Sequence, residues 1–271
     1  GNAAFLALIQ TQIGQAFNAV LASPPDLKVL LNIALIIGAA SLGRGLLQFA
    51  RNFGAEFLAQ KIERDVRNEL YVSLLGKSMT FHSLQPVGDT MARATNDVRE
   101  VNFMFSPGLS LVVGSLNFLI MPLFIAPRYH PSLILTPAIF VIAYVISIRA
   151  YLKTLGPITD SVRGSFGILN TRLSEALEGI ETVKGAAQEE AEVQRFTENV
   201  TRYRDASVHQ GEAEARYLPL LLLSVALAFG LFHALFLYTR GILNLGDVIA
   251  YFGILLMLDF PTFVSLWAYS Q

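Results

Sequence analysis

Cysteine is absent from the sequence, and histidine occurs only four times. The lack of cysteine excludes a disulfide framework, a thiol nucleophile and a cysteine-ligated metal site, so the compartment has to be inferred from topology. The four histidines are too scattered for a metal-spaced cluster, and neither a pair of catalytic carboxylates nor a Ser/His/Asp set is present. The residues therefore indicate neither a catalytic centre nor a bound metal or cofactor.

Charged residues are also few. They make up 15% of the chain and hydrophobic residues 53%, whereas soluble domains have about 25% charged residues. The mean hydropathy of +0.49 agrees with this balance. The composition predicts a membrane protein. The net charge of -1, without a block of basic residues, excludes nucleic acid as a partner.

The first 25 residues carry no charge, but they lack the basic start and the cleavage site of a signal peptide. We interpret them as the end of a first membrane helix that begins upstream. The sequence Ser23-Pro24-Pro25-Asp26 follows, and its two prolines predict a turn because proline lacks an N–H and has a restricted φ.

From Leu27 to about Met79 no proline interrupts the chain. A helix of that length extends about 80 Å, whereas the hydrocarbon core of a bilayer is about 30 Å thick. The first half is mostly apolar, and the half that starts at Arg51 is rich in Lys, Arg, Glu and Asp. One helix therefore crosses the membrane and continues far beyond it.

The same design repeats along the chain and predicts an all-α membrane protein. It would have six long transmembrane helices, two long charged extensions on one side and short turns on the other. The expected spans are 1–22, 27–79, 87–127, 131–181, 188–239 and 247–271.

The distribution of lysine and arginine predicts the orientation of these helices. Seven of the 20 lie in the extension from Arg51 to Arg99 and nine in that from Arg149 to Arg216. Basic residues favour the cytoplasmic side, so both extensions are expected there. This topology is typical of a multi-pass protein of the plasma membrane, which in bacteria is the inner membrane. Glu63 with Arg67 and Glu198 with Arg202 have the i, i+4 spacing of helical ion pairs.

Three groups of residues carry a resemblance to a known family. They are Glu63-Arg64-Asp65-Val66-Arg67 with Leu70-Tyr71, Leu74-Leu75, Phe81-His82, Val87-Gly88-Asp89 and 93–98; 173–184 with Glu189-Glu190 and Arg195-Phe196; and 245–251 with Pro261. Together with the six-helix layout, they resemble the transmembrane domain of an ABC exporter of the type I class. They are similar to its first intracellular loop, its second intracellular loop and its sixth helix, in that order.

The resemblance implies a short coupling helix at the end of each cytoplasmic extension, seated in a groove of an ATPase domain. The first is expected at about 80–85 and the second at about 182–187. The implied contact residues are Phe81, His82, Thr182, Val183 and Lys184. Without the resemblance, Phe81 could equally well pack against its own helix pair, and a solvated His82 would be the favoured interpretation.

A phosphate loop of the form G-x-x-x-x-G-K-[ST] is missing from the sequence. The chain therefore has no cradle for ATP phosphates and is not expected to be an enzyme by itself. The resemblance places ATP and Mg²⁺ on a nucleotide-binding domain, either later in the same protein or on a separate subunit. We expect an excised membrane domain that pairs with a second transmembrane domain, as a homodimer or a heterodimer, within membrane lipid.

The segment 86–101 separates the first coupling helix from the third membrane helix. Pro86 and Gly88 end one helix and permit the turn into the next. Asn96, Asp97 and Arg99 follow, and we expect them to bond to the neighbouring long helix rather than to nucleotide. The segment would then support the coupling helix.

Two charged residues lie at membrane depth, Arg44 and Asp259. Intramembrane charge costs about 2.5 to 3.5 kcal/mol at a helix centre, so it usually faces a partner or a wet cavity. The two residues could pair or share a cavity, and Arg44 could instead extend toward the outer surface. Asp259 stands two residues before Pro261, where the helical hydrogen bonds are already interrupted.

Uncharged polar residues give a weaker signal for the same pathway. Single polar groups in helix bundles often only bond to a neighbouring helix. The candidates are Gln48, Asn52, Asn117 and His233.

Three functions remain open at this stage. The first is the membrane half of an ATP-driven exporter that moves a lipid-like or amphipathic substrate, as in multidrug or lipid export. The second is a regulatory or structural membrane protein that has the exporter fold and transports nothing. The third is a channel or carrier that works without ATP, from this chain alone.

Asp259→Asn removes the charge proposed for the pathway. In the full-length transporter, we expect it to change the stimulation of ATP hydrolysis by substrate, because a cavity-facing carboxylate contributes to substrate contact. ATPase assays with and without substrate, alongside transport assays, measure the effect. Unchanged stimulation and transport across several substrates would contradict a role for this carboxylate.

Overall fold

Helices account for the secondary structure of the computed structural model, which describes residues 1–22 and 26–270 and has no strand among them. In lipid, every backbone polar group needs a partner within the protein, and a helix provides one. Six helices are long and apolar enough to cross a membrane, which confirms the predicted fold class. The expected turn at Ser23–Pro25 and the last residue, Gln271, lie outside the described residues.

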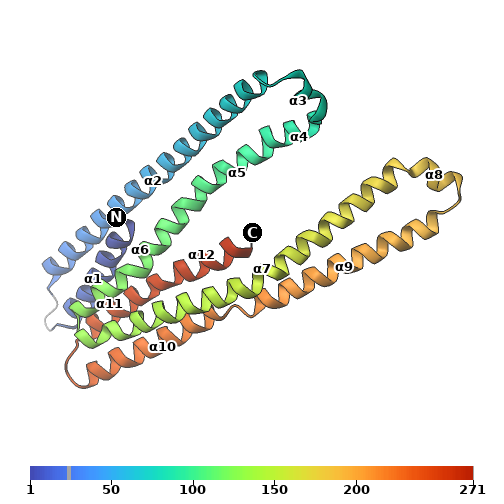
Figure 1. Ribbon diagram of the computed structural model, residues 1–271. Coiled ribbons are helices and arrows are strands. Elements are labelled where there is room, and N and C mark those ends of the chain that lie inside the picture. The colour runs from blue at the N-terminus through green and yellow to red at the C-terminus, as the bar shows by residue number, and fades with distance from the viewer. Residues whose placement is uncertain (23–25, 271) are drawn as a thin grey trace. The chain divides into compact units, whose positions relative to one another are not determined.

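The α-helices are labelled in Figure 1. They are α1 (Asn2–Leu21), α2 (Leu27–Leu75), α3 (Met79–Leu84), α4 (Val87–Ala92), α5 (Val98–Phe103), α6 (Ser110–Ile125), α7 (Leu135–Glu178), α8 (Ile180–Gly185), α9 (Glu189–Ala215), α10 (Leu218–Thr239), α11 (Leu245–Leu255) and α12 (Asp259–Ser270). Short 3₁₀ turns are Ala126–Arg128, Pro131–Ile134 and Leu256–Leu258.

The chain divides into two compact units. The first consists of Gly1–Ala138 and Ala226–Val264, and the second consists of Ile139–Val225 with the residues from Ser265 on.

A long hairpin dominates the first unit. Asp26 caps α2 by accepting hydrogen bonds from the N–H groups of Lys28 and Val29 at 2.9 and 3.3 Å. The helix then continues for 49 residues. It leads through the short α3 and α4 into α5, which returns beside it (Figure 1).

Glu63 joins the two arms of this hairpin. One of its carboxylate oxygens accepts from Arg67 at 2.7 Å, as the i, i+4 spacing predicted. The other accepts from Asn102 Nδ2 of α5 at 2.6 Å, and Asn102 is only 5% exposed. A buried amide with a charged acceptor is well stabilised, so this bond holds the arms together far from the membrane segment.

The returning arm is less regular than the expected continuous span. It contains two π-helical segments, Arg93–Asp97 and Met104–Leu109, and Ser106 within the second has an extended backbone with φ -132° and ψ 109°. Pro107 explains the conformation, because a proline disfavours helical dihedrals in the residue before it. Ser106 Oγ donates to Glu56 of α2 at 2.8 Å.

The expected contacts of Asn96, Asp97 and Arg99 with α2 are not present in the part of the chain that the structure describes. Arg99 instead places its guanidinium 5.3 Å from the centre of the Phe103 ring. The bonds across the hairpin come from Asn102, from Ser106 and from Arg67, which donates to the Ala94 carbonyl at 3.3 Å. The hairpin is braced as expected, but by other residues.

Small residues bring α1 and α11 into backbone contact within the first unit. A methyl group on Gly246 would collide with the Gly14 carbonyl oxygen, and one on Gly14 would collide with the Gly246 carbonyl and with Ala250. Asn18 Oδ1 accepts from the Gly246 N–H at 2.8 Å. Close approach of this kind is a main source of helix association in membranes.

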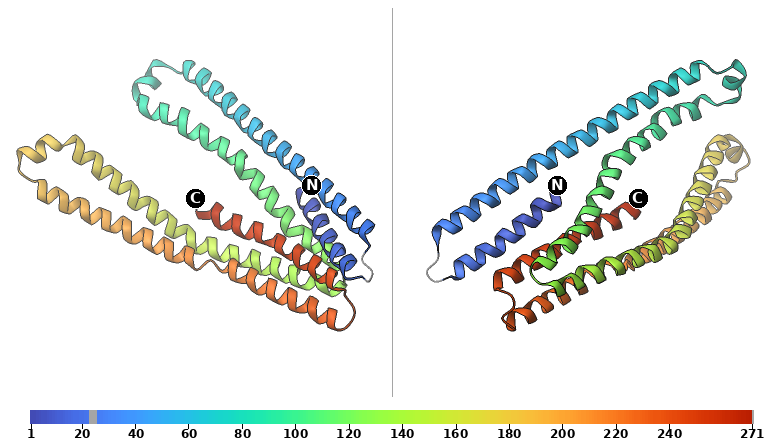
Figure 2. Two further views of the ribbon diagram at one scale, coloured as in Figure 1. Left: turned by 180° about the vertical axis from the view of Figure 1, so that it is seen from behind. Right: turned by 60° about the vertical axis from the view of Figure 1, so that its left-hand side comes forward.

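The second unit contains another hairpin, α7 and α9, closed by α8. Figure 2 shows the two arms side by side from both directions, and the rings of Phe166 and Tyr203 meet across them at 5.5 Å. The turn after α8 uses Ala187 at φ +50°. The Ala187 N–H bonds to the Lys184 carbonyl, and the Gln188 N–H bonds to the Val183 carbonyl, which together form a Schellman motif.

The fifth expected span, 188–239, is interrupted. α9 ends at Ala215 and α10 starts at Leu218, because Pro219 has no N–H to continue the hydrogen bonding of α9. Tyr217 at the break is 5% exposed, and its hydroxyl lies 2.6 Å from Ser265 Oγ. Tyr144 donates to the same oxygen at 2.8 Å. The break is therefore tied to α7 and α12.

Gly246→Ala tests the packing of α1 against α11. The added methyl group meets a backbone carbonyl that cannot move alone, so we expect a loss of about 1–3 kcal/mol in stability. Thermal unfolding in detergent measures it. Gly38→Ala is the matched control: nothing lies within 4 Å of its methyl group, and alanine is the better helix former. Equal midpoints for both variants would contradict the packing role.

Candidate functional site

The tip of the first hairpin presents the expected coupling residues. Ser78 caps α3 by accepting from the Phe81 N–H at 3.3 Å, and the Phe81 ring is half-buried beneath the Lys77 ammonium, 5.7 Å from the ring centre. His82 is exposed, although its Nε2 lies 3.0 Å from the Leu74 carbonyl oxygen. Phe81 and His82 thus contact their own hairpin and also leave surface free for a partner, so the structure is compatible with both interpretations of these residues.

Two apolar residues of α3 extend farther into solvent than Phe81. Met79 is 84% exposed and Leu84 is 78% exposed. They were not among the coupling residues predicted from the sequence. Exposed apolar residues at the two ends of a short helix are nevertheless a recognisable signal of a contact surface.

The tip of the second hairpin is α8, which has the same length as α3. Thr182 and Lys184 are exposed, and Val183 is half-buried. Ile180 is 44% exposed. Each hairpin thus ends in a six-residue helix with exposed apolar and polar side chains.

A cavity of about 410 Å³ lies in the first unit among α1, α2 and the arm that contains α6. Its wall is mostly small or apolar, with Ala3, Leu58 and Phe118 among the lining residues. Gln48 and Asn117 also line it. The structure therefore brings together two of the predicted pathway residues.

A chain of polar side chains extends along one edge of this cavity. Arg44 Nε donates to Asn2 Oδ1 at 3.0 Å, Asn2 Nδ2 donates to Gln48 Oε1, and Gln48 Nε2 donates to Asn52 Oδ1 at 3.0 Å. Asn2 is the first residue of α1. Arg44 is thus bonded to the start of α1.

Arg51 is a cavity residue that the sequence analysis missed. It lines the cavity, and a methyl group on Gly114 would lie 3.5 Å from its Nη1. The signal was available, because Arg51 is seven residues after Arg44 and shares a helix face with it. Phe118 lies one helical turn after this glycine on α6, and the centre of its ring is 4.9 Å from that of Phe260. The cavity thus combines aromatic walls with a guanidinium.

Asp259 stands apart from this polar chain. It is exposed at the first residue of α12. No ion pair joins it to Arg44 among the residues that the structure describes.

The remaining candidate, His233, lies on α10 and contacts the turn between α6 and α7. Its Nε2 lies 3.2 Å from Ser132 Oγ, which lies 2.7 Å from His130 Nδ1. Nearby, Tyr129 donates to Thr11 Oγ1 at 3.0 Å, and burial raises the pKa of its hydroxyl. The surroundings of His233 are those of a residue that ties helices together, and it does not line the cavity.

Gln48→Leu tests the polar chain. It removes the group that bonds both Asn2 and Asn52, and we expect a loss of about 0.5–1.5 kcal/mol because hydrogen bonds between membrane helices are modest. The thermal unfolding midpoint in detergent measures it. Gln60→Leu on the same helix is the control, since among the described residues the Gln60 side chain bonds to Glu56 of its own helix and to no other helix. Equal unfolding midpoints for the two variants would show that the polar chain does not contribute to stability.

Comparison with known proteins identifies the family. The model of the ABC transporter transmembrane region matches residues 2–260. An ATP-dependent lipid A-core flippase of Pectobacterium atrosepticum is 26% identical over 265 residues, which cover 96% of this chain and 44% of the flippase. The Bacillus subtilis protein named "Probable multidrug resistance ABC transporter ATP-binding/permease protein YheI" is 29% identical over 215 residues, 78% of this chain and 36% of that protein.

A second Bacillus subtilis protein, the uncharacterised ABC transporter ATP-binding protein YknU, is 24% identical over 220 residues, or 80% of this chain and 38% of the relative. The chain thus spans about two-fifths of the length of these relatives. The family match covers nearly all of its sequence and confirms the resemblance carried by the two intracellular loops: the chain belongs to the ABC transporter transmembrane region family.

Proposed function

We propose that this chain forms one half of the translocation pathway of an ATP-driven exporter whose substrate is lipid-like or amphipathic. The observation that carries the proposal is the cavity of the first unit, where aromatic and aliphatic walls surround Gln48, Asn117 and Arg51. Apolar walls with a few polar groups suit a molecule that has a hydrophobic body and a polar head. One relative is named as a lipid A-core flippase, which agrees with such a cargo.

The proposed exporter contains a second transmembrane domain and two nucleotide-binding domains that hold ATP and Mg²⁺. The relatives named as ATP-binding or ATP-binding/permease proteins support this composition. The two charged hairpins then lie on the cytoplasmic side of the plasma membrane, which is the inner membrane in bacteria, as the distribution of lysine and arginine favours.

In this proposal α3 and α8 are coupling helices. Phe81, Met79 and Leu84 of α3 offer apolar contact area to a nucleotide-binding domain, and Thr182 and Lys184 of α8 add polar contacts. Movement of that domain reaches the membrane segments through the hairpins, which are stiff because bonds such as Asn102 to Glu63 join their arms.

Asp259 remains a proposed pathway residue on different grounds. Its carboxylate is exposed, and it follows a short 3₁₀ turn and precedes Pro261. A substrate or the second transmembrane domain could therefore contact it when the pathway is assembled.

Phe81→Ala in the full-length transporter, reconstituted in liposomes, tests the function. Truncating an aromatic anchor in an interface usually costs more than 1 kcal/mol, so we expect the substrate moved per ATP hydrolysed to fall about fivefold. Basal hydrolysis and insertion should persist. Parallel measurements of phosphate release and substrate uptake provide the ratio.

Phe57→Ala is the matched control, because Phe57 is an exposed aromatic residue of α2 outside the tip. It should leave the ratio unchanged. An unaltered ratio in Phe81→Ala would remove the coupling role from α3, and a chain that moves no substrate in any assay would favour a regulatory protein.

A further inference from the structure

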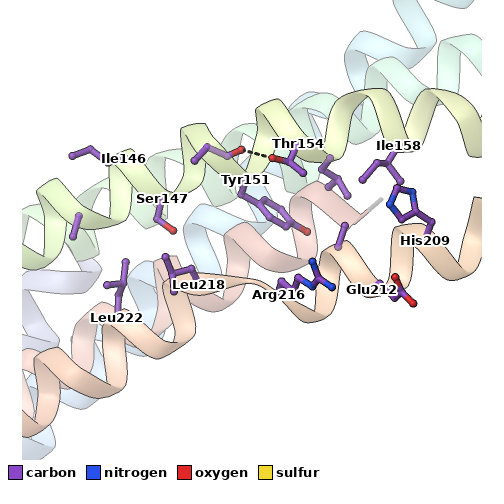
Figure 3. Close-up of a pocket in the computed structure, with 14 residues that line it drawn as sticks. Ile146, Ser147, Tyr151, Thr154, Ile158, His209, Glu212, Arg216, Leu218 and Leu222 are labelled. Atoms are coloured by element: carbon purple, nitrogen blue, oxygen red, sulfur yellow. Dashed lines mark hydrogen bonds between the residues drawn. The ribbon is translucent and has the colours of Figure 1, made fainter.

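A second cavity, of about 600 Å³, lies within the second unit between α7 and the α9–α10 segment. Figure 3 shows its two ends. Ile146, Leu218 and Leu222 line one end, and His209, Glu212 and Arg216 line the other. It shares no lining residue with the cavity of the first unit. The proposed pathway therefore does not account for it.

The two ends of this cavity lie at different membrane depths. α10 has 22 residues and spans about 33 Å, close to the thickness of a hydrocarbon core. Arg216 comes two residues before it and thus lies where hydrocarbon meets the headgroups, on the side of the charged hairpins. Leu222 lies about 9 Å farther into the hydrocarbon. The cavity therefore passes from headgroup level into the acyl-chain region.

The polar end contains charges of both signs without protein partners. Glu212 lies in the last turn of α9 and Arg216 follows four residues later as the residue after the helix end, yet no ion pair joins them or links either to another described residue. Both are exposed to the cavity side of the helix and to solvent. The charged end can therefore accept both an anion and a cation from a single ligand.

Tyr151 lies between the two ends and adds a further polar group to the cavity wall (Figure 3). Its hydroxyl oxygen is buried and lacks a hydrogen-bond partner in the described part of the chain. A buried hydroxyl without a partner is costly. A ligand with ester or phosphate oxygens at this depth would provide the missing acceptor.

We propose that this cavity binds one resident phospholipid with a primary ammonium headgroup, of the phosphatidylethanolamine type, which is held and not transported. Its phosphate bonds to Arg216, its ammonium donates to Glu212, and one acyl chain lies along Ile146 and Leu222. An anionic phosphatidylglycerol would place no cation near Glu212. Phosphatidylcholine has no N–H to donate to that carboxylate.

Native mass spectrometry of the delipidated full-length transporter tests this site. The probes are phosphatidylethanolamine, phosphatidylglycerol and phosphatidylcholine with the same palmitoyl and oleoyl chains, added in equal amounts. We expect wild type to retain phosphatidylethanolamine about two- to fivefold better than either other lipid, the range of a partly solvated ion pair. Glu212→Gln should abolish this preference, and Arg216→Gln should weaken retention of all three lipids.

Glu198→Gln and Arg202→Gln are the matched controls, since Glu198 and Arg202 have the same order and the same four-residue spacing within α9 and do not line the cavity. They should retain the wild-type pattern. Ala150→Phe fills the cavity from α7 and should reduce retention of every lipid, while an unchanged elution volume confirms folding.

Three outcomes would overturn the proposal. They are equal retention of the three lipids by wild type, a preference that survives in Glu212→Gln, and a cavity that retains no lipid because a second copy of the chain covers it. Because the readout is bound lipid, it is separate from transport, and the proposed function can fail while this site stands.

Discussion

The structure depends on one constraint, which is that a backbone in hydrocarbon must form its own hydrogen bonds. The constraint explains why the described chain is helical from end to end and why its main irregularities lie near the ends of the apolar stretches. At two of these breaks a side-chain hydrogen bond reaches another helix. Ser106 donates to Glu56 where the first hairpin enters its membrane segment, and Tyr217 lies 2.6 Å from Ser265 Oγ at the start of α10.

The general architecture could be predicted from the sequence because hydropathy and charge change in long blocks. Proline-free apolar runs continue into charged runs, and this pattern predicts helices that outlast the membrane. The Glu63–Arg67 pair was also predictable, since it depends only on spacing within one helix. Local rules of this kind need no knowledge of neighbouring helices.

Contacts between helices could not be predicted in the same way. A π turn accommodates an extra residue and rotates the side chains that follow by about 100°. One such segment, Arg93–Asp97, directly precedes α5, so the face of α5 that meets α2 is shifted. Asn102 therefore contacts Glu63, whereas Asn96, Asp97 and Arg99 were the residues expected from a regular helix.

The candidate site shows the same division. Gln48 and Asn117 stood out as polar residues in apolar helices, and both line the cavity. Asn2 could not be predicted because its role depends on the pairing of α1 with α2. Arg51 has the seven-residue spacing from Arg44, but only the pairing of α2 with α6 shows that it lines a cavity. Arg51 looked like the first charge of the extension, but its guanidinium lies beside Gly114.

The unequal arms of the first hairpin have a mechanical consequence. α2 is an unbroken helix that continues about 36 Å beyond Arg51. Its partner arm has a joint at Ser106, where the backbone is not helical. When the tip is displaced, the rigid α2 transmits the movement, and the partner arm bends at this joint, which the bond from Ser106 to Glu56 ties to α2. The joint lies next to the stretch where α6 passes Arg51, so bending there would change the width of the cavity.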